Sequence, residues 1–192
     1  DYSELNGMAF FATGSMFNTI AIEPIADSLI EGNDTVTITL LQNTNYIIGN
    51  LSNATSYIID KPFSNWKLTR FSQVQLQDEN ISGDNADPDS DGITNLKEYV
   101  LGLNPLVPDS DKNQFPKAEW RNDEFVVTLK FNKQASDYNV LFEASSNLLH
   151  WSSNTNVIST SVINEEVDFT TIQSRYKNQS RCGFIRWLPL EN

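Results

Sequence analysis

Alternating acidic residues between positions 87 and 98 form the part of the sequence best suited to chemistry. Carboxylates stand at Asp87, Asp89 and Asp91, and Glu98 follows seven residues after the last of them. A hard divalent cation takes about six to eight oxygen ligands, and alternate acids on a tightly turning loop point the same way. Gly92 permits that sharp turn. The spacing therefore predicts a calcium site.

The residues after the glycine complete the predicted ligand set. Ile93 provides its backbone carbonyl, and Asn95 contributes an oxygen directly or through a water molecule. Glu98 closes the site with two oxygens, because the chain has by then become helical and turns this side chain back to the ion. The predicted main site therefore consists of Asp87, Asp89, Asp91, Ile93, Asn95 and Glu98.

A helix after the loop is predicted from a separate pattern. Apolar residues recur at the i, i+3, i+4 and i+7 positions of one helical face, namely Leu96, Tyr99, Val100 and Leu103. Gly102, followed by a proline, predicts the end of the helix. The helix supports a closing role for Glu98. The alternative is an acidic solvated loop without metal, in which several like charges would repel one another.

A second acidic cluster, residues 109–114, begins like another calcium loop. Gln114 stands where a glycine is needed, and no closing acid follows at the right distance. We interpret the cluster as degenerate. It either binds no metal or lends Asp109 or Asp111 to the first site.

The composition narrows the classes of function. The chain carries 25 acidic and 13 basic side chains, a formal net charge of −12, which argues against nucleic-acid binding. Cys182 and His150 are the only residues of their types, so neither an internal disulfide nor a zinc site of cysteines and histidines can form. No run of about 18 apolar residues occurs, so no membrane insertion is predicted. Acidity instead favours cations.

Residues 1–60 carry strand patterns. Thr35 to Leu40 alternates strictly between threonine and apolar residues, as a half-buried strand requires. Further β-rich runs are Met8 to Phe11, Phe17 to Glu23 and Ala54 to Ile59. Four strands make an incomplete sandwich with open edges. We therefore expect the missing strands to come from upstream residues or from a neighbouring chain.

This segment resembles the second half of a Calx-β domain. The resemblance rests on Asp1-Tyr2, Gly14, the run from Ile25 to Val36 and the run from Asn53 to Asp60. It implies an immunoglobulin-like sandwich of the kind found in extracellular arrays and ion exchangers, with calcium held by acidic loops at one end. The matching ligands would be Asp1, Asp27, Glu31 and Asp60. The alternative is that these four carboxylates are ordinary loop residues.

Residues 84–114 resemble the EF-hand-like calcium loops of bacterial surface and secreted proteins, which are akin to thrombospondin type 3 repeats. The similarity lies in the runs 86–99 and 101–105. It implies a rigid calcium-dependent connector rather than a signalling sensor, since no incoming helix is recognisable before Asp87. A short helix with Ser64 as its N-cap is expected earlier in the same connector.

Residues 115–192 return to β-structure. Alternation predicts strands at 125–131 and 138–143, and further strands are expected at 155–160, 165–172 and 182–188. The run from Asp137 to Leu148, followed by Trp151, resembles the C-terminal β-modules of large bacterial exoproteins.

The expected fold class is mainly β. Two immunoglobulin-like β-sandwich units are joined by a short helical calcium-loop connector, which gives the segments 1–60, 61–114 and 115–192. The expected function is a calcium-stabilised structural or adhesive segment of a secreted or cell-surface multidomain bacterial protein, and not an enzyme. Its partners would be neighbouring domains or other copies of the protein. The alternative is a carbohydrate-binding accessory module of an exported polysaccharide-active enzyme, with a stacking platform formed by Trp120, Trp151 and Trp187.

Overall fold

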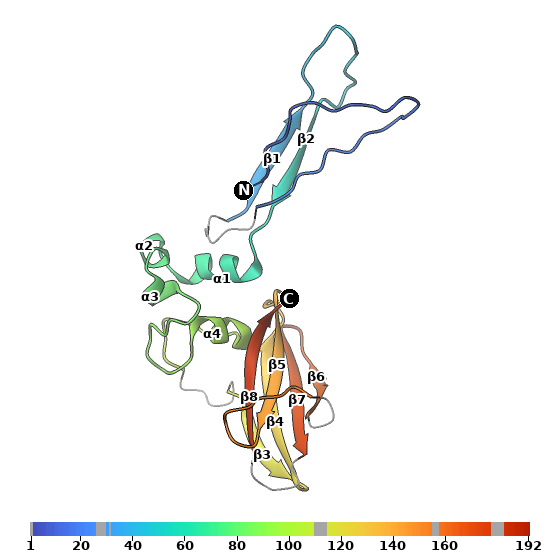
Figure 1. Cartoon of the computed structure of the whole chain (residues 1–192). Coiled ribbons are helices and arrows are strands. Elements are labelled where there is room, and N and C mark those ends of the chain that lie inside the picture. Colours follow the sequence, from blue (N-terminus) through green and yellow to red (C-terminus); the bar gives the residue numbers. More distant parts are fainter. Residues whose placement is uncertain (1, 26–29, 31, 110–114, 155–157, 178–182) are drawn as a thin grey trace. The chain divides into compact units, whose positions relative to one another are not determined.

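The chain is mainly β and divides into two compact units, Asp1–Asp60 and Lys61–Asn192. Figure 1 shows both units in a computed structural model. The structure describes residues 2–25, 30, 32–109, 115–154, 158–177 and 183–192.

The first unit contains one antiparallel strand pair. β1 (Asp34–Thr39) pairs with β2 (Asn53–Ile58), and the hydroxyl groups of Thr37 and Thr55 lie 2.9 Å apart across the pair. Among the described residues of this unit only Val36 is buried. The strands predicted at 35–40 and 54–59 are therefore confirmed, each displaced by one residue, although the pair encloses almost no core.

The strands predicted at 8–11 and 17–23 are wrong. These segments form no ladder, and the one bridge among the described residues of this part of the chain, between Tyr2 and Pro24, lies outside both of them. Met8 and Phe17 are 67% and 78% exposed. Both segments are rich in apolar residues, but a strand also needs a hydrogen-bonding neighbour and a surface that covers its apolar face.

Four helices precede the sheets of the second unit in its described part. They are α1 (Pro62–Arg70), α2 (Gln73–Leu76), α3 (Glu79–Ser82) and α4 (Asn95–Leu101). The helix expected with Ser64 as its N-cap instead has Lys61 at that position and begins at Pro62, because proline is well suited to the first position of a helix. No helix was recognisable in the sequence before the acidic loop; the structure has the four-residue α3, which ends five residues before Asp87.

Helix α4 confirms the helix predicted after the loop. Tyr99, Val100 and Leu103 are at most 6% exposed. Gly102 follows the last helical residue with φ of +73°, the left-handed conformation that favours glycine, and its N–H group donates to the carbonyl of Tyr99.

Six strands form two antiparallel sheets in the second unit (Figure 1). The four-stranded sheet has the order β3-β4-β7-β6, and β5 pairs with β8 in a second, two-stranded sheet. The bounds are β3 Lys117–Arg121, β4 Glu124–Asn132, β5 Tyr138–Ser145, β6 Ile158–Glu165, β7 Phe169–Lys177 and β8 Phe184–Glu191.

Some of the strands predicted for this unit are confirmed, one is shifted and one was missed. Those at 125–131 and 138–143 are confirmed within β4 and β5. The one at 165–172 is shifted, because residues 166–168 turn the chain between β6 and β7. The first residues of the run 155–160, and Cys182, lie outside the described residues. β3 was missed because all five of its residues are exposed and mostly polar.

Two apolar clusters meet at α4. Leu101 and Leu103 belong to the core of the sheets, together with buried side chains of β4, β5 and β7. Tyr99 and Val100 instead pack with an aromatic group supplied mainly by α1, in which the Phe63 and Tyr99 rings are 4.9 Å apart. The helix is therefore held between the sheets and α1.

Asp137 ties this arrangement together with hydrogen bonds. Its carboxylate accepts one from the hydroxyl of Tyr99 at 2.6 Å and one from the N–H group of Phe63 at 2.9 Å. Burial and the contact with Asp137 raise the pKa of Tyr99 well above its usual value, so the hydroxyl remains a donor. One carboxylate thus joins α4, the start of α1 and the turn before β5.

Replacing Tyr99 by phenylalanine tests this contact. We expect Tyr99→Phe to lower the free energy of unfolding by about 1–3 kcal/mol, because it removes a hydrogen bond to a charged group and leaves one oxygen of Asp137 without its donor. Urea unfolding followed by circular dichroism measures the change. Tyr138→Phe is the matched control in the same aromatic cluster, and equal unfolding midpoints for the two variants would contradict the expectation.

Candidate metal centre

Backbone N–H groups hold the first three acids of the loop. The carboxylate of Asp87 accepts hydrogen bonds from Asp91 at 3.2 Å and from Gly92 at 2.9 Å. Asp91 in turn accepts one from Ile93 at 2.8 Å. Gly92 has φ of +94°, so the tight turn does require a glycine. These contacts fold the loop so that its alternate acids face one another.

The acids converge in two groups of three. Oxygens of Asp87, Asp89 and Asp91 lie within 4.8 Å of one another, and so do oxygens of Asp91, Glu98 and Asp109. Ligands on opposite sides of a calcium ion are about 4.6–5.2 Å apart, twice its usual oxygen distance. The spacing within each group therefore fits a bound cation, and Asp91 links the two groups.

Glu98 is the most unusual member of the cluster. Its side chain is fully buried at 0% exposure, and neither carboxylate oxygen has a hydrogen-bond partner within the described ranges. Burial, followed by the negative charges of Asp89 and Asp91, raises its pKa to about 8. A buried carboxylate with no donor is costly unless it binds a proton or a cation.

Asp89 also has a buried carboxylate oxygen without a partner, but its second oxygen is hydrogen-bonded. One of its oxygens accepts a hydrogen bond from the N–H group of Asp91 at 3.2 Å, whereas the other is buried with no such partner in the described structure. Burial and the neighbouring charges of Asp91 and Asp87 raise its pKa, against the opposing effect of the backbone donor. Two separate carboxylates thus present unsatisfied oxygens to one region.

Asp109 joins the site from beyond α4. Its backbone N–H group donates to Asp91 at 2.9 Å, which brings its side chain to Asp91 and Glu98. This is the arrangement that the sequence left open as one of two alternatives. Asp111 lies outside the described residues.

The side chains of Ile93 and Asn95 also contact other parts of the second unit. The side chain of Ile93 packs against the core of the sheets. The side-chain amide of Asn95 donates to the carbonyls of Ile81 and Gly83, both at 2.8 Å. The remaining side-chain oxygen of Asn95 is buried without a hydrogen-bond partner in the described part of the chain.

The segment before the loop was not predicted from the sequence to support the acidic site. Asp78 caps α3 by accepting a hydrogen bond from the N–H group of Asn80 at 2.9 Å. Asp84, after the helix, forms an ion pair of 2.6 Å with Lys67 of α1. An aspartate followed by an acidic first turn was a usable helix-start signal. The backbone carbonyls that accept from Asn95 could not be identified from the sequence.

The ligands that the Calx-β resemblance implies cannot be assembled from the described structure. Asp1, Asp27 and Glu31 lie outside the described residues. Asp60 is described, and its carboxylate accepts a hydrogen bond from the N–H group of Gly32 at 2.9 Å. This leaves one carboxylate of the predicted four.

The three tryptophans of the carbohydrate-binding alternative make separate contacts. Trp120 on β3 packs against Phe125, with ring centroids 5.2 Å apart, whereas Trp187 lies on β8. The guanidinium of Arg186 is 4.3 Å from the Trp151 ring. Across the described residues, no ring contact joins two of these tryptophans.

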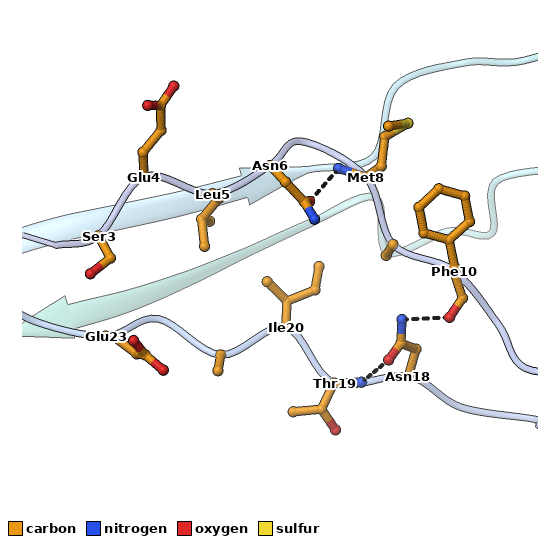
Figure 2. Close-up of a pocket in the computed structure, with 12 residues that line it drawn as sticks. Ser3, Glu4, Leu5, Asn6, Met8, Phe10, Asn18, Thr19, Ile20 and Glu23 are labelled. Atoms are coloured by element: carbon orange, nitrogen blue, oxygen red, sulfur yellow. Dashed lines mark hydrogen bonds between the residues drawn. The ribbon is translucent and has the colours of Figure 1, made fainter.

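A hollow in the first unit offers little chemistry. It lies between the extended segments 3–10 and 18–23, and the side-chain amide of Asn18 donates to the carbonyl of Phe10 at 3.0 Å (Figure 2). Its ionisable lining residues are Glu4 and Glu23 alone.

In the parts that the structure describes, no helix has both the length and the apolar character needed to cross a membrane.

Comparison of the chain with protein-family models, curated proteins and solved structures returned no match. Function is therefore argued from the acidic cluster itself.

The raised pKa of Glu98 generates a pH prediction for the protein in chelator. A carboxyl whose pKa is raised on folding stabilises the folded state below pH 4.5 and loses that contribution as pH rises through about 8. We expect the free energy of unfolding to fall by a few kcal/mol, on the order of 1.4 kcal/mol per pKa unit, between pH 5 and 8. Chemical unfolding at several pH values measures this slope.

Glu98→Gln is the matched control, because glutamine keeps the shape of the side chain and does not ionise. The variant should show a much flatter slope over the same pH range. An equal slope in the two proteins would assign the pH dependence to other groups.

Proposed function

We propose that the acidic loop and Asp109 bind a calcium ion, and that this ion stabilises the second unit as a structural or adhesive segment of a secreted or cell-surface multidomain protein. The observation that carries the proposal is Glu98, a fully buried carboxylate with two unpartnered oxygens, surrounded by further carboxylates. A divalent cation provides the partner that the described protein groups do not.

The chemistry of the donors favours calcium over other metals. The two groups contain five carboxylates and neither histidine nor cysteine, which suits a hard cation and not zinc. Calcium accepts many oxygens in an adaptable arrangement, whereas magnesium demands near-ideal octahedral geometry and retains water. Five carboxylates that converge from a loop, a helix and a later segment fit the first description better.

The ion would stabilise the chain by joining segments that are distant in sequence. Asp91 lies in the loop, Glu98 in α4 and Asp109 beyond it. At a calcium concentration of ten times the dissociation constant the folded state gains about 1.4 kcal/mol, and at a hundred times about 2.7 kcal/mol. Extracellular calcium modules bind with constants on the order of 0.1–1 mM, which is why we propose a location outside the cell.

The same proposal includes immunoglobulin-like pairing for both units. In the second unit two antiparallel sheets share one core. In the first unit the support is the resemblance in sequence together with exposed apolar residues that need cover, such as Met16 and Ile47. Neighbouring domains or other copies of the protein are the partners that we propose. A structural role is favoured over a catalytic one because the acids converge on one another and not on a cleft of mixed polarity.

Calcium titration tests the proposal directly. We expect binding by isothermal titration calorimetry in chelator-treated protein, and a melting temperature that rises with calcium and falls with chelator. Chelation should also expose residues 84–109 to proteases. A melting curve unchanged by chelator and by excess calcium would contradict the proposal, and magnesium serves as the comparison metal.

Two substitutions assign the binding to this loop. Asp89→Ala should reproduce the effect of chelation on the melting temperature and abolish further response to calcium, because it removes a carboxylate that has an unsatisfied oxygen. Asp27→Ala in the first unit should change both readouts less. The reverse ranking would move the main calcium site to the first unit.

A further inference from the structure

Hydrogen bonds close the acidic loop at its base. The N–H group of Asn95 donates to the carbonyl of Ala86 at 2.9 Å, and that of Leu96 donates to the carbonyl of Asp84 at 3.1 Å. The side-chain amide of Asn95 adds two bonds of 2.8 Å, to Ile81 and to Gly83. Four hydrogen bonds thus join the chain before the loop to the first residues of α4.

We infer that Asn95 is a positioning residue for the cation site: it holds the incoming chain against α4, so that the loop acids and Glu98 lie together before any ion binds. The inference rests on the calcium-binding function proposed above. It differs from the role expected from sequence, in which Asn95 contributes an oxygen to the ion. The amide nitrogen, and not the oxygen, carries the positioning role.

The burial of Asn95 makes the side chain difficult to replace. The residue is 0% exposed, so water cannot take over the hydrogen bonds if the amide is lost. An aspartate would place an oxygen against two carbonyl oxygens and would add a buried charge. A serine would reach fewer acceptors with a single hydroxyl hydrogen. Only asparagine supplies two hydrogens at this length.

The chain around Gly83, whose carbonyl accepts from Asn95, leaves no space for a side chain. A Cβ atom added at Gly83 would lie 2.3 Å from the carbonyl oxygen of Glu79, which is part of the backbone of α3. The incoming chain therefore turns away from α3 through a space that admits only glycine, and it presents the Gly83 carbonyl to Asn95. Both partners in the contact are constrained by shape.

Closure before binding affects affinity through entropy. An open acidic segment would lose conformational freedom when an ion orders it, and its acids would repel one another as they converge. On this inference the hydrogen bonds at the base of the loop form before an ion binds, and they remove part of that cost from the binding step. Groups that orient metal ligands typically change metal affinity by about 10- to 100-fold when they are replaced.

The substitution Asn95→Asp separates the two possible roles. If the oxygen of Asn95 were the important group, aspartate would keep an oxygen for the ion and add a favourable charge, so affinity for calcium would be unchanged or tighter. If the amide positions the loop, affinity should weaken by about 10- to 100-fold. The melting temperature in chelator should also fall, because the variant loses the two bonds to Ile81 and Gly83 and buries a charge; the calcium affinity is therefore the readout that separates the two roles.

Calcium chloride is the probe, and titration calorimetry is performed at a temperature at which circular dichroism shows the variant to be folded. Tyr99→Phe is the matched control on the same helix. It should lower the melting temperature without changing calcium affinity, because it lies in the aromatic cluster. If Asn95→Asp does not fold in chelator, the calcium concentration that restores its circular dichroism spectrum is compared with that of the wild-type chain treated with a matching amount of urea. Recovery at higher calcium supports the inference.

Calcium affinity that is unchanged or tighter in Asn95→Asp overturns the positioning role, and so does recovery of folding at equal or lower calcium. These results would leave the calcium site itself standing. Absence of calcium binding by the wild-type chain would instead refute the proposed function, and the inference with it. The two failures are therefore distinguished by the wild-type titration alone.

Discussion

The burial of Glu98 among other acids is the constraint on which the second unit depends. A carboxylate without donors is among the least favourable groups to bury, and here it stands beside Asp91 and Asp109. The protein could avoid this cost by turning the side chain toward solvent. It does not, because α4 is fixed on other sides by apolar contacts. Packing therefore forces the charge inward, and a proton or a cation must neutralise it.

Helix α4 connects the acidic site to the rest of the unit. It is only seven residues long, too short to be stable in isolation. Its stability comes from Tyr99 and Val100 against α1 and from Leu101 against the sheets. Neutralising the charge of Glu98 therefore stabilises α4, the helix that joins the two apolar clusters. The calcium ion that we propose at Glu98 would thereby stabilise the whole unit.

The acidic loop and α4 were predictable because their signals are local. Alternate acids, a glycine that needs a positive φ and a 3.6-residue apolar period are all read within about 17 residues of chain. The recruitment of Asp109 was only an alternative, since it depends on a hydrogen bond to Asp91 formed after folding. The contacts of Asn95 were not predictable, because their acceptors are backbone carbonyls that any residue could supply.

The first unit shows the limit of periodicity. Its sequence contains seven acids and no lysine or arginine, and its apolar residues alternate in two of its four β-rich runs, yet Val36 alone is buried among its described residues. Alternation states which face of a strand is apolar but not what lies against that face. In the second unit, by contrast, side chains from both sheets and from α4 enclose one core. Stability that depends on burial must therefore reside mainly after residue 61, where the acidic loop can add to it.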